Sequence, residues 1–335
     1  MSASVAASAV AGHLSRRARW RGVEIFFWLA VVALIFALPS RALLINEILI
    51  AGLFALSLDL VLGYAGIVSL GQAAFFGAGA YGAAIIANAG LADPLTGLVI
   101  AGLLAAGLGL LTAPLLLRGS DLTRLMVTLG IALLLGELAN RNSWATGGAD
   151  GLSLAVKPVL GLFPIDFTGQ RNAALYSLAV LFLLFALARR LMQSPFGLSV
   201  RALKENRLRS GALGISAATR IIAIYAIAAA YAGVAGALVA QTTGLVSLDV
   251  FDFHRSADVM LMLIIGGAGY LYGGLIGAAF FIALKDGVSS ATPEYWEFWI
   301  GLPLVVLVLV GRERIGATIA KYVRRGAALF GWRGR

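Results

Sequence analysis

The amino-acid sequence predicts an all-α protein that crosses a membrane several times, with about 8–10 membrane segments. Of its 335 residues, 60% are apolar and only 13% are charged, and the mean hydropathy is +0.93. The apolar residues form runs of about 20, the length that a helix needs to cross a hydrocarbon layer of ~30 Å. The formal charge of +10 is concentrated in the chain ends and short loops. These observations exclude a soluble enzyme, a disordered chain and a nucleic-acid-binding chain.

The first membrane segment follows a polar N-terminus that ends in four arginines, Arg16, Arg17, Arg19 and Arg21. No small-x-small cleavage site follows the apolar run Glu24–Leu38, so we expect an uncleaved helix rather than a signal peptide. Further spans are predicted at Leu43–Leu62, Ile67–Asn88, Leu95–Leu117, Leu125–Asn140, Asn172–Ala188 and Ile221–Thr242, and a last one at Trp296–Val310.

The stretch Ser256–Leu284 decides the number of crossings, because it is too long for one helix and too short for two full ones. Five glycines between Gly266 and Gly274 can break it into two short helices. The chain then has ten apolar segments and both termini lie in the cytoplasm, where 20 of the 26 lysines and arginines are placed. We therefore divide the chain into a basic cytoplasmic N-terminus (1–23), a transmembrane domain (24–311) and a basic cytoplasmic tail (312–335).

Glycine is enriched in two stretches, Gly63–Gly82 and Gly266–Gly277, among 41 glycines in total. Most glycines in transmembrane helices allow the helices to pack closely. Paired glycine-interrupted segments in the two halves of a transporter instead mark broken helices that line the translocation path. The clustering favours this second interpretation for the two stretches.

The sequence carries no motif for catalysis, metal binding or cofactor binding. It contains no cysteine and only two histidines, His13 and His254, which excludes disulfides, thiolate sites and histidine metal clusters. None of its four lysines (Lys157, Lys204, Lys285 and Lys321) follows a glycine, so the chain has no phosphate-binding P-loop of its own.

Carboxylates inside membrane segments are informative, because a charge at the helix centre costs about 2.5–3.5 kcal/mol. Glu47 and Glu137 fall near the outer ends of their predicted spans, and Asp59 near the inner end of its own. A carrier driven by ions or protons usually has a carboxylate at the midplane, so this pattern disfavours secondary transport. Asp59 is the strongest functional candidate, although a carboxylate solvated at the helix end is the simpler interpretation.

The longest predicted cytoplasmic loop, residues 192–219, contains a short polar helix. Ser194 and Pro195 are typical of a helix start, with a serine cap followed by proline in the first turn. The polar run Arg201–Arg209 continues the helix, and Gly214 is expected to end it in a left-handed conformation. Such a segment is either an ordinary basic loop or a docking element for a soluble partner.

Residues 56–81, LSLDLVLGYAGIVSLGQAAFFGAGAY, resemble the signature of LIV-type ABC-importer permeases. These are the inner-membrane subunits of bacterial leucine/isoleucine/valine importers. The outer loop 146–152, the cytoplasmic stretch from Ser194 to Ile215 and the glycine turn 266–278 are similar to the same family in the same order. The resemblance covers roughly residues 43–311 and implies an all-helical permease.

The resemblance implies partners, because these permeases contain no ATPase. It implies a second homologous permease, two cytoplasmic ABC ATPase subunits that bind the ATP, and a periplasmic substrate-binding protein. The helix of the 192–219 loop is similar to the family's coupling helix, which assigns docking on the ATPase to Arg201, Glu205, Asn206 and Gly214. Residues expected along the translocation path are Asp59, Gly63, Gly66, Ser69, Gly71, Gln72, Gly266, Gly267 and Gly269.

Three residues depart from the family pattern. Gln72 replaces a common histidine, Asp59 a frequent asparagine, and Arg207 a residue that is often acidic. The first two concern the expected path, so they bear on the substrate. The expected function is ATP-driven import of branched-chain or related hydrophobic amino acids by a non-enzymatic subunit of the inner membrane. Import of urea or short-chain amides, or an ion-coupled secondary transporter, are the alternatives.

Overall fold

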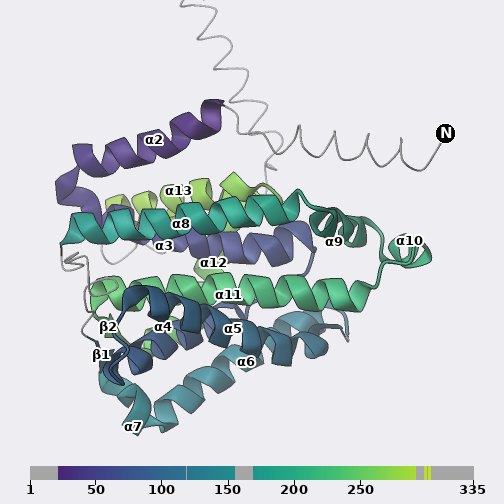
Figure 1. The fold of residues 1–335 in the computed structure, drawn as a ribbon, viewed down its shortest axis with the longest axis horizontal. Coiled ribbons are helices and arrows are strands. Elements are labelled where there is room, and N and C mark those ends of the chain that lie inside the picture. Colours follow the sequence, from purple (N-terminus) through teal and green to yellow (C-terminus); the bar gives the residue numbers. More distant parts are fainter. Residues whose placement is uncertain (1–21, 118, 155–168, 292–297, 300, 303–335) are drawn as a thin grey trace, which may run out of the picture. The chain divides into compact units, whose positions relative to one another are not determined.

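The computed structural model describes residues 22–117, 119–154, 169–291, 298–299 and 301–302, and the chain forms two compact units, 1–279 and 280–335. The described residues are mostly helical (Figure 1). The α-helices are α2 (Gly22–Ala37), α3 (Ala42–Leu58), α4 (Gln72–Asn88), α5 (Pro94–Leu117), α6 (Asp121–Arg141), α7 (Ser143–Thr146), α8 (Gln170–Met192), α9 (Pro195–Glu205), α10 (Arg207–Ala212), α11 (Ala217–Thr243), α12 (Phe253–Gly266) and α13 (Leu271–Ala291). Short helical turns are η1 (Pro39–Arg41), η2 (Asp59–Tyr64), η3 (Gly148–Asp150) and η4 (Leu248–Phe251).

The predicted all-α membrane architecture is confirmed. Within the described residues, six helical segments are long and apolar enough to cross a membrane: Pro39–Tyr64, Pro94–Leu117, Asp121–Arg141, Gln170–Met192, Ala217–Thr243 and Leu271–Ser289. Helices α2, α4 and α12 are shorter, with 16, 17 and 14 residues. The expected last span, 296–310, and both basic termini lie almost wholly outside the described residues. The cytoplasmic placement of the termini and the division at 23 and 311 stay predictions.

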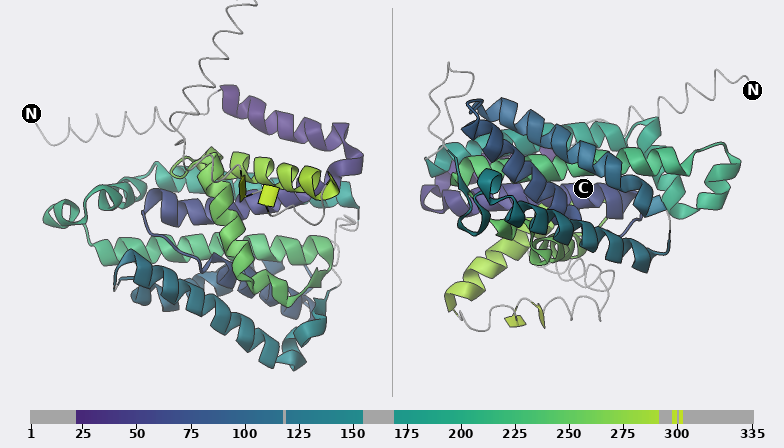
Figure 2. Two further views of the ribbon diagram at one scale, coloured as in Figure 1. Left: turned by 180° about the vertical axis from the view of Figure 1, so that it is seen from behind. Right: turned by 90° about the horizontal axis from the view of Figure 1, so that it is seen from below.

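The centre of the first unit is formed by α3, α4, α5 and α11, which pack together through small residues. A side chain at Gly79 would collide with the backbone of Gly233, and one at Gly236 would collide with the carbonyl of Phe76. Close approach of helix backbones at small residues is typical of packing inside membranes, where lipid removes the hydrophobic driving force between helices. Helix α12 runs obliquely across α3 and α11 in the view from behind (Figure 2).

One end of this unit carries a short ribbon that was not expected from the sequence. Strands β1 (Leu152–Ser153) and β2 (Leu245–Val246) pair antiparallel, with Leu152 opposite Val246. The ribbon lies at the opposite end from α9 and α10 (Figure 1). We call these two ends the strand end and the α9 end.

Buried side-chain hydrogen bonds join four helices near the strand end. Asn46 of α3 accepts from Ser177 Oγ of α8 at 2.6 Å and donates to Thr242 Oγ1 of α11 at 3.2 Å. Tyr176 donates to Gln241 Oε1 at 2.8 Å, and Gln241 Nε2 donates to the Pro94 carbonyl at 2.9 Å. We call these residues the strand-end network. It ties α3, α5, α8 and α11 at one level.

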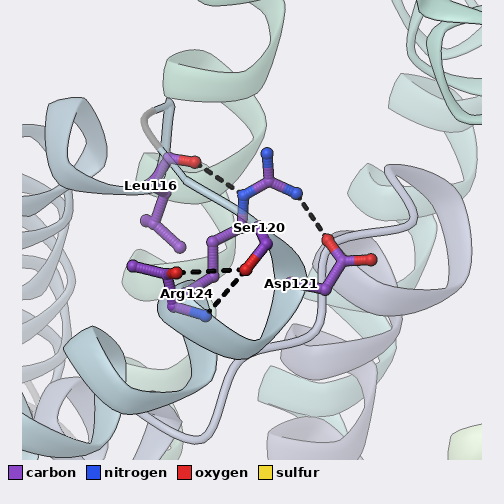
Figure 3. Close-up of polar contacts among 5 residues, drawn as sticks. Leu116, Ser120, Asp121 and Arg124 are labelled. Carbon is purple, nitrogen blue, oxygen red and sulfur yellow. Dashed lines mark hydrogen bonds and ion pairs between the residues drawn. The ribbon is translucent and has the colours of Figure 1, made fainter.

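The turn between α5 and α6 is held by a buried arginine at the α9 end (Figure 3). Arg124 Nε donates to the Leu116 carbonyl at 2.8 Å, and its Nη1 pairs with Asp121 at 2.6 Å. Ser120 accepts from the backbone N–H of Thr123 and begins α6. Arg124 thus satisfies a carbonyl that the end of α5 leaves without a helical partner.

The glycine break predicted within Ser256–Leu284 is confirmed. Helix α12 ends at Gly266 and α13 begins at Leu271, with Gly267 at φ +98° and Gly269 at φ +87° between them. These left-handed conformations favour glycine. The expectation of two short helices is wrong for α13, which has 21 residues. Helix α13 continues through the more polar residues after Leu284. The hydropathy of the sequence falls there, but helix formation does not require apolar side chains.

Candidate functional site

The first glycine cluster breaks the membrane segment that begins at Pro39. Helix α3 passes into the π-helical turn η2 (Asp59–Tyr64), and residues 65–71 then form no regular helix before α4 begins. Gly66 adopts φ +70°, and the Ile67 N–H returns to the Val61 carbonyl at 3.1 Å. A π-turn changes the direction of side chains and leaves irregular backbone, and such turns are frequent at functional sites.

Asp59, the first residue of η2, is fully buried, with 0% of its surface exposed. Its Oδ1 accepts from the backbone N–H of Gly269 at 2.7 Å, and its Oδ2 has no hydrogen-bond partner among the described residues. The simpler expectation, a carboxylate solvated at a helix end, is therefore wrong. The position of Asp59 along its membrane segment could be predicted from the sequence. Its burial could not, because the glycine turn that covers it lies 210 positions later in the chain.

Gly63 allows η2 and the turn between α12 and α13 to touch. A Cβ at this position would collide with Asp59 Oδ1 and with the Gly269 backbone nitrogen. The Gly63 carbonyl accepts from Lys204 Nζ of α9 at 2.6 Å. A glycine from the first cluster, a glycine from the second and a lysine of α9 therefore meet at one point.

Helix α9 makes two further contacts with this region. The guanidinium of Arg201 lies 4.8 Å from the centre of the Tyr64 ring. At Gly66, the Lys204 Cγ lies 2.8 Å from the position that a Cβ would occupy. We call Asp59, Gly63, Tyr64, Gly66, Arg201, Lys204 and Gly269 the α9-end junction.

The junction brings together residues that the sequence assigned to two separate sites. Arg201 was expected at the ATPase, and Asp59, Gly63, Gly66 and Gly269 on the path. Lys204 was not among the expected site residues. Its position three residues after Arg201 places both on one helix face, which is the signal that sequence reasoning missed.

Three other expected path residues lie at the start of α4 instead. The Gly71 N–H donates to Ser69 Oγ at 3.3 Å, and the neighbouring amides of Leu70 and Ala73 donate to hydroxyls of Thr128 and Ser256. A Cβ at Gly71 would lie 2.8 Å from the Thr128 carbonyl oxygen. The backbone at this broken helix is thus satisfied by hydroxyl groups from three segments of the chain.

Gln72 is the exception in this group. It is fully buried, and neither its Oε1 nor its Nε2 has a hydrogen-bond partner among the described residues. A buried amide without a partner costs about 1–3 kcal/mol. The two remaining path candidates are backbone positions: Gly266 packs against the Gly273 carbonyl, and Gly267 is in the left-handed turn.

The loop at the α9 end forms two helices, whereas one was predicted. Asn206 is extended (φ −158°, ψ 106°) and its Oδ1 accepts from the Arg209 N–H at 2.9 Å, so it ends α9 and caps α10. Pro195 begins α9 as expected, but the Ser194 hydroxyl donates to the Leu191 carbonyl at 2.6 Å and does not cap the helix. Gly214 adopts φ +79°, which confirms its predicted left-handed conformation.

The outer surface of α9 and α10 is exposed and mixes apolar with charged side chains. Leu208 and Leu213 are 89% and 74% exposed, and Glu205, Arg207 and Arg209 are exposed beside them. We call these five residues the α10 surface. Glu205 forms no ion pair within the described chain, because the break at Asn206 removes the helical spacing to Arg209 and Arg201 faces Tyr64.

Comparisons with known proteins identify the family. A family model described as a branched-chain amino acid transport system permease component matches residues 40–309. The chain is 31% identical over 287 residues to the high-affinity branched-chain amino acid transport system permease protein LivM of Escherichia coli (strain K12). It is 30% identical over 287 residues to LivM of Salmonella typhimurium. Each alignment covers 78% of this chain and 66% of the relative, so the chain spans about two thirds of the relatives' length.

A more distant relative is the autoinducer 2 import system permease protein LsrC of Photorhabdus laumondii. It is 25% identical over 205 residues, which cover 59% of this chain and 58% of the relative. No solved structure matches the chain.

Proposed function

Because this chain belongs to the family of branched-chain amino acid transport system permease components, we propose that it is the membrane-spanning subunit of a binding-protein-dependent ABC importer. Six long apolar helices among the described residues make it a multi-pass membrane protein, and the bacterial inner membrane is its proposed location. A second homologous permease completes the pore, and a periplasmic binding protein delivers the substrate. Two cytoplasmic ATPase subunits bind and hydrolyse the ATP.

The α10 surface is the observation that carries this proposal. Two exposed leucines flanked by charged side chains fit a docking surface with an apolar centre and a polar rim. The same segment is bonded on its inner side to a broken membrane helix, through Lys204 and Gly63. An element with one face open and the other attached to the membrane domain suits a coupling role between a soluble ATPase and the permease.

The proposed substrate is a branched-chain or related hydrophobic amino acid, as the names of the LivM relatives suggest. Sequence similarity alone does not fix the substrate, since the more distant relative LsrC is named for import of a different molecule. Uptake of labelled leucine should be inhibited by isoleucine and valine and unaffected by urea. If urea or short-chain amides inhibit this uptake and isoleucine and valine do not, the proposed substrate class is wrong.

The docking role is tested by Leu208→Asp, with Trp144→Asp as the matched control. Both side chains are 89% exposed, and Trp144 lies in α7, away from the α9 end. In the complex purified with the co-expressed second permease and ATPase, Leu208→Asp should reduce ATPase co-purification at least about tenfold, because docking would bury an unpaired carboxylate. Glu205→Arg should act in the same direction, and Trp144→Asp should retain wild-type co-purification.

Substrate-stimulated ATP hydrolysis in proteoliposomes should fall in parallel with co-purification. Wild-type values of both quantities in Leu208→Asp and Glu205→Arg would show that the α10 surface does not dock the ATPase. Uptake driven by a proton or sodium gradient in the absence of ATP would show that the protein is a secondary transporter and that the proposed function is wrong.

A further inference from the structure

Two hydrogen bonds at the α9-end junction connect α9 to the turn between α12 and α13. We propose that Lys204 and Asp59 are positioning residues that transmit displacement of α9 to this glycine turn through η2. The inference rests on the proposed function, because it concerns how docking at the α10 surface changes the membrane domain. It gives Lys204 a role, and it moves Asp59 from lining the path to holding the turn.

The first bond joins α9 to η2. Lys204 Nζ donates to the Gly63 carbonyl at 2.6 Å, and the lysine stem lies directly on Gly66. Carbonyl groups near the end of a helical segment carry partial negative charge and attract a cation. The stem needs the space at Gly66, which adopts φ +70° and has no side chain. Arg201 supports the same contact from the preceding turn of α9, against the Tyr64 ring.

The second bond joins η2 to the glycine turn. Asp59 Oδ1 accepts from the Gly269 N–H at 2.7 Å, at a fully buried position. Hydrogen bonds from a backbone amide to a carboxylate are among the stronger ones in proteins, and burial strengthens them. Gly269 is in a left-handed turn, so its amide has no helical partner, and Asp59 supplies the acceptor.

The two bonds meet on one short element. Gly63 accepts from α9, and its Cα lies against both Asp59 and the Gly269 nitrogen without space for another atom. A close-packed contact transmits displacement rather than absorbing it. Movement of α9 therefore reaches the start of α13 through Gly63, Asp59 and Gly269. The unbonded Oδ2 gives Asp59 capacity for a further hydrogen bond in another arrangement of the turn.

The test separates transmission from docking and from folding. Lys204→Met keeps the stem on Gly66 but removes the donor, and Lys204→Arg keeps a donor. Asp59→Leu removes the acceptor, and Asp59→Asn keeps one acceptor oxygen. Arg190→Met is the control, because it removes an exposed positive charge at the end of α8.

The measurement uses the complete importer in proteoliposomes with ATP supplied, and compares substrate molecules transported per ATP hydrolysed. Lys204→Met and Asp59→Leu should lower this ratio at least about fivefold, the lower end of typical coupling effects. ATPase co-purification should stay at the wild-type level. Lys204→Arg and Asp59→Asn should recover at least about half of the ratio, and Arg190→Met should match the wild type.

An unchanged ratio in Lys204→Met would overturn the inference, and so would an equal loss in Lys204→Met and Lys204→Arg. If Asp59→Leu fails to fold, Asp59→Asn and Lys204→Met still decide the question. If the wild-type chain does not co-purify with the ATPase, the proposed function itself is wrong. Co-purification of the wild-type chain is therefore measured first.

Discussion

Asn46 near the strand end and Asp59 at the α9 end are both buried polar residues of the same membrane segment, and their hydrogen bonding differs. At the strand end, Asn46 is bonded through both its oxygen and its nitrogen to side chains of two other helices. At the α9 end, Asp59 is bonded through one oxygen, and the other has no partner among the described residues. Gly63 packs directly against Asp59, where a Cβ would collide with its Oδ1.

The difference indicates which end is fixed. A polar network with every member bonded rigidifies a structure, because any displacement leaves several groups without partners. A junction with an unused acceptor and glycine backbones has more than one arrangement available. We infer that the strand end holds α3, α5, α8 and α11 together while the α9 end rearranges during transport.

The largest expected effect is that of Gly63→Val. The new side chain cannot fit between Asp59 and the Gly269 backbone, and overpacking of this kind costs about 1–3 kcal/mol or more. We expect complete loss of transport, with a reduced amount of protein in the membrane. Uptake of labelled leucine, normalised to membrane protein, measures it.

The control for this substitution is Gly107→Val in α5, where no atom lies within 4 Å of the new Cβ. It should transport at wild-type rates. Normal transport by Gly63→Val would show that the junction tolerates bulk and that the tight contact described here is not required.

An intermediate effect is expected for Asn46→Leu at the strand end. Removal of the amide takes the acceptor from the buried Ser177 hydroxyl, whereas Thr242 keeps its bond to the Leu238 carbonyl. The loss should cost about 1–3 kcal/mol of the free energy of unfolding. The number of substrate molecules transported per ATP should not change, because the network holds helices and transmits nothing. Thermal unfolding of the purified complex and the transport ratio provide the two measurements. A lower ratio at normal stability would contradict the assignment of the strand end as a fixed frame.

The smallest effect is expected for single cysteines at Trp144 and Leu208, which should leave stability and transport nearly unchanged. Both positions are 89% exposed and the chain has no cysteine of its own. An impermeant maleimide added to intact spheroplasts should label Trp144→Cys and spare Leu208→Cys, because the charge pattern places the strand end outside. The reverse pattern of labelling would invert the proposed orientation.

Much of the fold could be predicted because hydropathy and glycine act locally. The apolar runs mark the helices, and the glycines at 266–274 mark the break between α12 and α13. The partners of individual basic residues could not be predicted from charge. Arg124 and Arg189 are buried and pair with Asp121 and Glu24.

The candidate site was predicted only as separate parts. Motif resemblance selected Asp59, Gly63, Gly269 and Arg201, but it did not bring them together or include Lys204. The reason is that the junction depends on contacts between segments far apart in the chain, and single-sequence patterns report local periodicity. The ribbon of β1 and β2 was missed for the same reason, since two residues per strand leave no alternation to detect.

The hydrogen bond between Asp59 and Gly269 also has a consequence for biosynthesis. Its two residues are 210 positions apart. At a synthesis rate of roughly 5–20 residues per second, the carboxylate waits about 10–40 s for the amide that binds it. During that time η2 carries a carboxylate that is costly to place in lipid, so η2 is not expected to reach its final position until α12 has been inserted. A chain truncated before Gly269 keeps this carboxylate without the amide that binds it.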